Sequence, residues 1–181
     1  MATQLNGARV AFVATDGVEQ VELDRPWAAV TEAGGQPELI SLSAGKIQAF
    51  NHLDPSETRP VDRVLDDADP DDYVALVLPG GVANGDFVRA DQRAVSFVKA
   101  FFEADKPVGV ICHGGWVLIE AGVASGRTVT SWPSLQTDFR NAGAEWVDQQ
   151  LVVDGNLVTS RNPDDLPVFS GAVVERIAAA T

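Results

Sequence analysis

Short runs of apolar residues alternate along this chain with longer stretches in which apolar residues recur every three or four positions. Continuous apolar runs are typical of strands buried on both faces of a parallel sheet, and they predict strands at residues 8–14, 37–42, 73–78, 108–111 and 128–132. The helical spacing predicts helices at residues 18–34, 94–102, 116–121, 134–142 and 166–180. Residues 146–153 and 156–159 are expected to form a hairpin that turns at Asp154 and Gly155.

This order of elements predicts an α/β fold, namely a three-layer, doubly wound, flavodoxin-like sandwich with a mostly parallel sheet. Pro26 falls inside the first predicted helix and is expected to kink or restart it. The polar stretch at residues 46–60 is expected to hold a hairpin or a small excursion. Residues 84–86 are expected to lie in a loop after the turn at residues 79–81.

Composition limits the classes of protein that need consideration. The chain has 181 residues, of which 45% are apolar, and a formal net charge of -13. We expect one domain spanning residues 1–181, and no binding to nucleic acid or to anionic membranes. A single cysteine excludes an internal disulfide framework, and no signal peptide or membrane-spanning segment is recognisable, so we expect a cytoplasmic protein.

Residues 108–121, VGVICHGGWVLIEA, carry the strongest chemical signal. A short apolar strand is followed by Cys112, His113 and two glycines, and then by an apolar helix. A nucleophile between a strand, a small-residue turn and a helix makes a nucleophile elbow. The backbone N–H groups that open the helix would face the sulfur and favour the thiolate, which is both a nucleophile and an oxidation target.

Taken without context, a lone cysteine is more often an inert, buried hydrophobic residue than a reactive one. Its context favours reactivity, because Cys112 ends a strand at the edge of the sheet where ligands bind in open α/β folds. Gly80 and Gly81 end the preceding strand and are expected to lie beside it. They either make a simple turn or, with the N–H of His113, form an oxyanion hole; spacing alone favours neither.

The other ionisable candidates are two histidines and two glutamates. His113 is adjacent in sequence to Cys112, so their side chains are expected to diverge, and a role as general base would need an orienting carboxylate. His52 is expected to lie on the surface. With one cysteine and two histidines, we expect no zinc site, no other metal and no cofactor. Glu22 is explained by the acid preference of helix N-termini, whereas Glu19 can instead point into the pocket and shuttle a proton.

Six motifs in one order resemble the PfpI-type intracellular proteases, within the superfamily of class I amidotransferase-like folds that includes the DJ proteins and the glyoxalase III enzymes. The resemblance runs from Arg9 to about Phe169. The motifs are ATDGVEQVEL (14–23), ALVLPGG (75–81), NGDFVR (84–89), KPVGVICHGGWVLIEAG (106–122), TSWPSLQTDFRNAGAEWVD (130–148) and VVDGNLVTSRNPDDLPVF (152–169).

The resemblance implies a role for each matching residue. Cys112 and His113 take the positions of the family nucleophile and histidine, and Glu19 that of the pocket glutamate that hydrogen-bonds the sulfur. Asp86 is the best match to the acid that reaches the histidine from a neighbouring subunit, and the oxyanion donors fall on the backbone of Gly81 and His113. One departure, Gly115 and Trp116 where many relatives have proline or alanine, is expected to alter the pocket floor.

The activities implied by the resemblance use one thiolate in different ways. The first is a stress-response cysteine hydrolase, either an intracellular protease or a deglycase or glyoxalase acting on methylglyoxal and its adducts, in a homo-oligomer that takes a small aldehyde or a peptide as substrate. The alternative is a redox sensor or stress-protective binding protein whose cysteine oxidises without robust turnover. An inactive scaffold has less support, because Cys112, His113 and Glu19 are all present.

Overall fold

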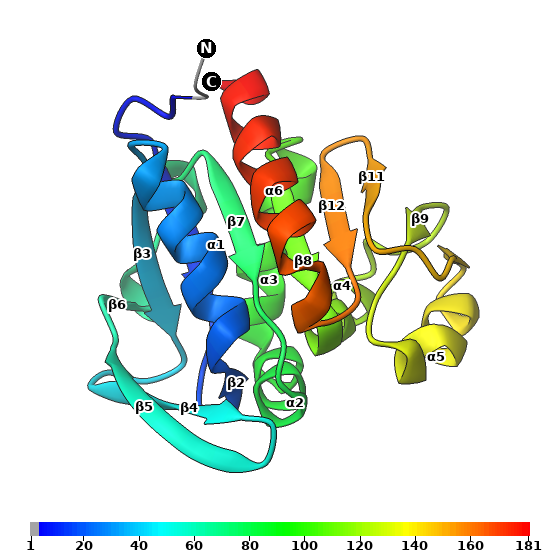
Figure 1. Ribbon diagram of the computed structural model, residues 1–181, viewed down its shortest axis with the longest axis horizontal. Coiled ribbons are helices and arrows are strands. Elements are labelled where there is room, and N and C mark those ends of the chain that lie inside the picture. The colour runs from blue at the N-terminus through cyan, green and yellow to red at the C-terminus, as the bar shows by residue number, and fades with distance from the viewer. Residues whose placement is uncertain (1–3) are drawn as a thin grey trace.

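The computed structural model describes residues 4–181, which form a central sheet covered by helices on both faces (Figure 1). The strand order is β11-β12-β8-β7-β1-β3-β6, and every neighbouring pair is parallel except β11 and β12. The strands are β1 (Arg9–Val13), β3 (Gln36–Ser41), β6 (Arg63–Val64), β7 (Ala75–Leu78), β8 (Val108–Ile111), β11 (Val152–Asp154) and β12 (Leu157–Ser160). The predicted doubly wound α/β sandwich is confirmed.

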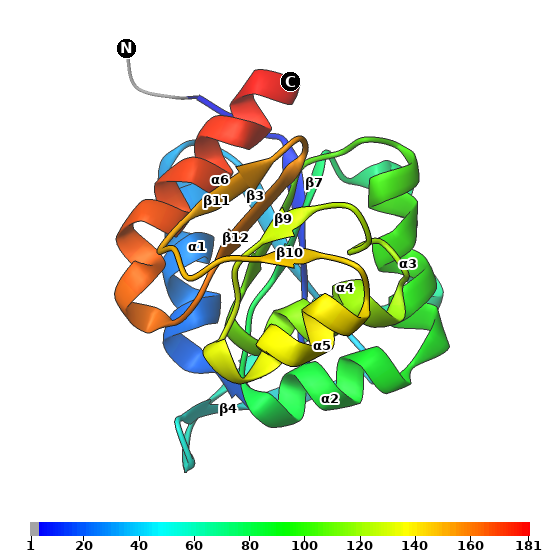
Figure 2. The same ribbon diagram turned by 90° about the vertical axis from the view of Figure 1, so that its right-hand side faces the viewer.

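Helices α1 (Gln20–Glu32) and α6 (Leu166–Ala180) pack side by side on one face of the sheet (Figure 1). Helices α3 (Gln92–Glu103), α4 (Gly115–Glu120) and α5 (Gln136–Asn141) lie on the other side, with α2 (Val82–Ala90) below the carboxyl ends of the central strands (Figure 2). Strand β1 shows why both faces are covered, since Ala11 and Val13 join one apolar cluster while Val10 and Phe12 join the other.

Smaller elements complete the fold. Strands β4 (Lys46–Asn51) and β5 (Asp54–Pro60) form the expected hairpin, which pairs through β4 with the short strand β2 (Val18–Glu19). Strands β9 (Thr128–Val129) and β10 (Glu145–Trp146) form a separate parallel pair. Single turns of 3₁₀-helix occupy Leu65–Asp67, Pro70–Asp72, Cys112–Gly114, Pro133–Leu135 and Pro163–Asp165.

The predicted restart of the first helix at Pro26 and the predicted loop at residues 84–86 were wrong. Helix α1 runs without interruption through Pro26, which is buried in its middle. Proline lacks the N–H for one helical hydrogen bond, and the packing of α1 against α6 and the sheet offsets that loss. Residues 84–86 lie within α2 and not in a loop, because Asn84 is buried and its side chain binds the backbone of Thr15, Pro79 and Gly80.

Among residues 4–181, no helix combines the length and the apolar character needed to span a membrane.

Candidate active site

Cys112 lies at a sharp bend between β8 and α4. Its φ of 59° falls in the left-handed region, which a side chain with a Cβ rarely adopts. Strain of this kind at a strand-to-helix turn is the geometry of a nucleophile elbow, in which the nucleophile stands clear of both flanking elements. The elbow predicted from the sequence is therefore present in the backbone.

The two Gly-Gly loops lie side by side, as expected, because β7 and β8 are parallel neighbours. The backbone N–H groups of Gly81 and His113 lie near enough to the Cys112 sulfur to lower the pKa of its thiol. Gly80 differs, because its N–H donates to Oε2 of Glu22 over 2.8 Å. The expectation of Gly80 as an oxyanion donor is thus corrected, while the N–H groups of Gly81 and His113 converge on the reactive position.

Glu22 is the carboxyl group at the sulfur. Its side chain is fully buried beside the Cys112 sulfur. Its Oε2 accepts a hydrogen bond of 2.8 Å from the N–H of Gly80, and its Oε1 has no hydrogen-bond partner among residues 4–181. Burial raises the pKa of Glu22 from 4.5 to about 8, against the opposing effects of the adjacent Cys112 thiol and the N–H of Gly80. Glu22 is therefore protonated at neutral pH and can donate its proton toward the sulfur.

Glu19, which was expected beside the sulfur, is placed differently. It belongs to β2, and its Oε2 accepts a hydrogen bond of 3.0 Å from the backbone N–H of His52 on the hairpin. It lines the same pocket but bonds the pocket wall, so the structure corrects its contact with Cys112. Helical spacing carried the missed signal, because Glu22 falls on the buried stripe of α1 with Leu23, Pro26 and Val30.

The protonation of Cys112 also departs from the expectation of a stabilised thiolate. Burial raises the pKa of the Cys112 thiol, and an ionised Glu22 raises it further, while the N–H groups of His113 and Gly81 lower it. A protonated Glu22 removes the repulsion and supplies a donor to the sulfur. Cys112 and Glu22 therefore behave as a coupled pair, in which the protonation of each group changes the pKa of the other.

His113 contacts Cys112 despite being its neighbour in sequence. Its Nδ1 lies 3.2 Å from Sγ, so the expected divergence of the two side chains is wrong. The ring stacks on Trp132 at 5.6 Å and meets Trp116 edge-on at 5.1 Å. Burial lowers the pKa of His113 to about 4, so the imidazole is neutral at pH 7 and can accept a proton.

Asp86 lies on the first half of α2 and lines the pocket, but its side chain is exposed. It forms an ion pair of 2.8 Å with Arg89 one helical turn away. Among residues 4–181, no carboxylate hydrogen-bonds the ring of His113. A Cys-His-Asp triad is thus not assembled within the one chain described.

These groups open into a pocket of about 610 Å³, which lies within the usual range for small-molecule sites. The pocket is lined by all the candidate residues described above except Gly80, namely Cys112, Glu22, His113, Glu19, Asp86 and Gly81, and by His52 on the hairpin. Trp116 is part of the wall, as the departure from the family pattern implied. Gly115 does not line the pocket, but it allows the Phe139 ring to pack closely behind the elbow, because a Cβ there would lie 2.8 Å from that ring.

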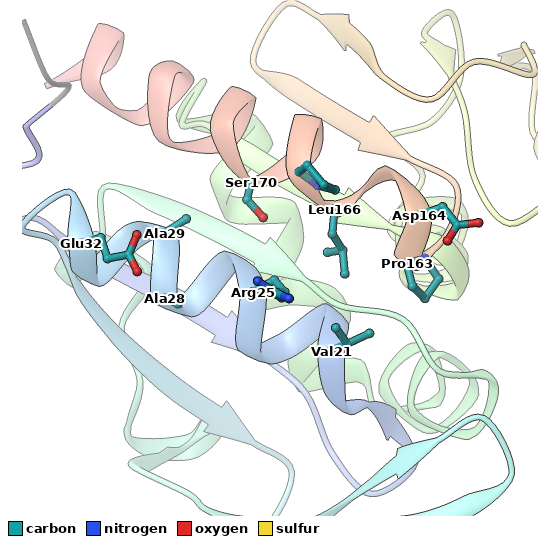
Figure 3. A pocket seen from close by; sticks show the side chains of 10 residues that line it. Val21, Arg25, Ala28, Ala29, Glu32, Pro163, Asp164, Leu166 and Ser170 are labelled. Carbon is teal, nitrogen blue, oxygen red and sulfur yellow. The ribbon is translucent and has the colours of Figure 1, made fainter.

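A second hollow, of about 510 Å³, lies between α1 and α6 (Figure 3). Arg25 and Ser170 face each other across it, and Val21 and Leu166 supply apolar walls. Its lining contains neither a thiol nor an imidazole, so it offers no nucleophile. Within residues 4–181, no three His, Cys, Asp or Glu side chains are grouped closely enough to hold a metal ion.

Gly80 permits the close approach of Glu22 and Cys112. A Cβ at this position would overlap Oε2 of Glu22 and lie 2.6 Å from the Cys112 Cβ. We expect Gly80→Ala to lower the free energy of unfolding by about 2 kcal/mol or more and to disrupt the pair. Denaturant unfolding and the rate of Cys112 alkylation measure the two effects.

Gly171→Ala is the matched control, because a Cβ there meets nothing within 4 Å and the residue lies in α6. This variant should gain about 0.5–1 kcal/mol of stability. A Gly80→Ala protein as stable and as reactive as wild type would contradict the close packing of the site.

Comparison with known proteins agrees with this geometry. The sequence matches the DJ-1/PfpI family over residues 8–176. It is 44% identical to "Deglycase TK1284" of Thermococcus kodakarensis (87% of this chain, 92% of that protein) and 41% identical to "Putative cysteine protease YraA" of Bacillus subtilis (90% and 94%). The crystal structure of Drosophila melanogaster DJ-1beta superposes with a TM-score of 0.87 at 24% identity (95% and 91%).

The relatives' names agree with the expected cysteine-dependent hydrolase or deglycase, and the structural likeness supports the fold. The match covers nearly the whole chain and includes both Gly-Gly loops, the elbow and the pocket wall. The protein therefore belongs to the DJ-1/PfpI family.

Proposed function

We propose that this protein is a cysteine-dependent enzyme of the stress response that converts 2-oxoaldehydes, and their adducts on amines or thiols, to 2-hydroxy acids. The observation that carries this proposal is the buried Cys112–Glu22 pair, in which one proton-bearing carboxyl group adjoins one sulfur. Aldehyde chemistry requires a nucleophile for the carbonyl carbon and a group that moves protons between adjacent carbons. The proposed site supplies both.

The proposed reaction begins when Sγ of Cys112 bonds to the aldehyde carbon, C1. The thiol proton passes to Nδ1 of neutral His113, at 3.2 Å, and the former carbonyl oxygen takes the proton of Glu22. During attack, the N–H groups of Gly81 and His113 stabilise the negative oxygen if it occupies the space they share with the sulfur.

Glu22, now ionised, removes the proton from C1 and returns one to C2, while the hydroxyl proton on the C1 oxygen passes to the C2 oxygen. C1 is thereby oxidised and C2 reduced without an external oxidant. The product of this isomerisation is a thioester of Cys112. Water then cleaves the thioester, His113 returns the proton to the sulfur, and the acid formed reprotonates Glu22. The net change is addition of one water molecule to a 2-oxoaldehyde. An adduct first breaks its bond from C1 to the amine or thiol, which leaves with the proton of the C1 hydroxyl and restores the aldehyde, and the same steps then give the 2-hydroxy acid.

Proteolysis has less support from the geometry. A protease needs a histidine oriented by a carboxylate to protonate the amine leaving group, and no carboxylate among residues 4–181 hydrogen-bonds the ring of His113. A redox-sensor role also has less support, because Cys112 is only 6% exposed and oxidation would make no use of the proton that the buried Glu22 holds beside the sulfur. Oxidation by peroxide follows thiolate character and access.

The test is incubation of the purified protein with methylglyoxal, with separate incubations with unstructured peptides. Proton NMR should show lactate forming catalytically while the peptides stay intact. Peptide cleavage without lactate would overturn the proposed chemistry in favour of a protease. Rapid stoichiometric oxidation of Cys112 by peroxide with no turnover of either substrate would overturn it in favour of a sensor.

We further propose that the chain works as a single domain in a cytoplasmic homo-oligomer. A lone cysteine that must stay reduced suits a reducing compartment. Asp86 is exposed at the pocket and, even with its ion pair to Arg89, accessible to a second copy, which agrees with the acid expected from a neighbouring subunit. Light scattering of the purified protein tests this assembly, and a monomer at all concentrations would contradict it.

A further inference from the structure

We infer that the pocket over Cys112 selects uncharged 2-oxoaldehydes that carry an aromatic or bulky apolar substituent, in preference to the smallest or to anionic ones. This inference rests on the proposed function and specifies its substrate class. It depends on the chemistry of the pocket wall, the absence of cations from that wall, and the way its rings are held.

Four aromatic side chains line the pocket, each from a different segment of the chain. Phe50 comes from β4, Phe87 from α2, Trp116 from α4, and Trp132 from the segment after β9. Aromatic rings offer large, rigid apolar surfaces that pack well against other rings. A methyl substituent would fill little of a pocket of about 610 Å³, whereas a phenyl ring would contact several walls at once.

The exposure of apolar side chains also points to this pocket. Large hydrophobic side chains exposed among residues 4–181 are Leu53 (91%), Val82 (57%), Phe87 (51%), Trp132 (39%) and Val153 (53%). All of them line the pocket except Val153, which lies on β11. Exposed apolar surface gathered at one opening is typical of a binding site. An apolar substituent entering the pocket would cover part of this surface.

Charge in the pocket opposes anionic substrates. Its lining includes the carboxylates Glu19 and Asp86 but no lysine or arginine. The nearby Arg89 pairs with Asp86, and its guanidinium lies over the ring of Trp116, 4.5 Å from the centroid. With no cation in the wall, a carboxylate or phosphate on the substrate would lose hydration without gaining a partner.

The two tryptophans are held in place close to the nucleophile. Asp138 accepts a hydrogen bond of 2.9 Å from Nε1 of Trp116, and Arg89 covers its face. Trp132 stacks on His113, whose Nδ1 is 3.2 Å from the sulfur. The apolar wall thus begins one side chain away from Cys112, where the substituent of a bound oxoaldehyde must lie.

The experiment compares phenylglyoxal with methylglyoxal in wild type, Trp132→Ala, Phe50→Ala and the control Val153→Ala. Mandelate and lactate are quantified directly. Phenylglyoxal also reacts with arginine side chains, so its disappearance would overstate the rate of turnover. The readout is the ratio of kcat/KM for the two substrates, which does not change with the fraction of folded protein. 4-Carboxyphenylglyoxal serves as the anionic probe.

We expect each pocket variant to lower the phenylglyoxal preference about tenfold, as apolar contacts in a pocket are worth one to two orders of magnitude in specificity. Val153→Ala should keep the wild-type ratio, and 4-carboxyphenylglyoxal should be a poorer substrate than phenylglyoxal. Phe50→Ala is decisive if Trp132→Ala fails to fold, because Phe50 lies on a different strand.

Failure of the inference differs from failure of the proposed function. Equal losses for both substrates in the pocket variants, or equal use of the charged and uncharged aromatic probes, would overturn the substrate class while turnover of methylglyoxal remained. No turnover of any oxoaldehyde by wild type would overturn the proposed function itself, and with it this inference.

Discussion

Replacing Cys112 with serine should abolish turnover of methylglyoxal while leaving the protein folded. A hydroxyl is a far weaker nucleophile than a thiol near neutral pH, so kcat/KM should fall on the order of 10³-fold or more. Serine is nearly the same size, and it shares the cost of the left-handed backbone at this position, where φ is 59°. The free energy of unfolding should therefore stay within about 1 kcal/mol of wild type.

Lactate formation and denaturant unfolding, measured on the same preparations, check both parts of this expectation. Because Cys112 is the only cysteine, no other thiol in the chain can substitute for it. A folded Cys112→Ser protein that keeps a tenth or more of wild-type turnover would show that the chemistry does not depend on the elbow. Such a loss would raise the activation free energy by no more than about 1.4 kcal/mol.

Replacing Glu22 with glutamine should lower activity and raise stability together. In the folded protein, burial raises the pKa of Glu22 from 4.5 to about 8. Between these values the unfolded chain releases a proton that the folded protein retains, so stability falls as pH rises from 4.5 to about 8. At pH 7 the difference costs about 3 kcal/mol, by the free-energy equivalent of a pKa shift.

Glutamine avoids that cost and can still accept the hydrogen bond from Gly80. Glu22→Gln should thus match wild type near pH 4.5 and exceed it increasingly toward pH 8, as measured by denaturant unfolding at several pH values. Without a proton to transfer, its kcat/KM should drop by roughly 10²–10⁴-fold. Wild-type stability at every pH, or a less stable variant at pH 8, would contradict a buried, protonated Glu22.

Glu19→Gln is the control for both effects. Glu19 bonds the hairpin backbone at His52 and is not packed against the sulfur, so its variant should keep most of the activity. Its stability should stay within about 0.5 kcal/mol of wild type across the same pH range. A larger effect at Glu19 than at Glu22 would reverse the assignment made from the structure.

Much of the fold follows from the hydrophobic pattern. Strand β8 and helix α6 begin and end at the predicted residues, because an unbroken apolar run and a long amphipathic stretch each allow one assignment. The sequence was less informative where tertiary contacts override local preference. Asn84 and Gly85 resemble a turn, yet the buried amide of Asn84 binds three backbone groups and holds α2 together.

The site was predictable in its nucleophile but not in its proton chemistry. Cys112 and His113 follow from the elbow motif, whereas the choice between Glu19 and Glu22 depends on where α1 begins. The pairing of β2 with β4 delays that start to Gln20, which turns Glu19 toward the hairpin and Glu22 toward the sulfur. The raised pKa of the thiol reflects burial, which a residue pattern does not quantify.

The pH dependence of Cys112 alkylation by iodoacetamide tests the central claim, that Cys112 and Glu22 form one coupled pair. Profiles are measured for wild type, Glu22→Gln and Glu19→Gln. We expect wild type to show an inflection near pH 8, where Glu22 loses its proton. In Glu22→Gln this inflection should either disappear or shift by at least about one pH unit. Glu19→Gln should follow wild type. Identical profiles for wild type and Glu22→Gln, or a shift only in Glu19→Gln, would contradict the account.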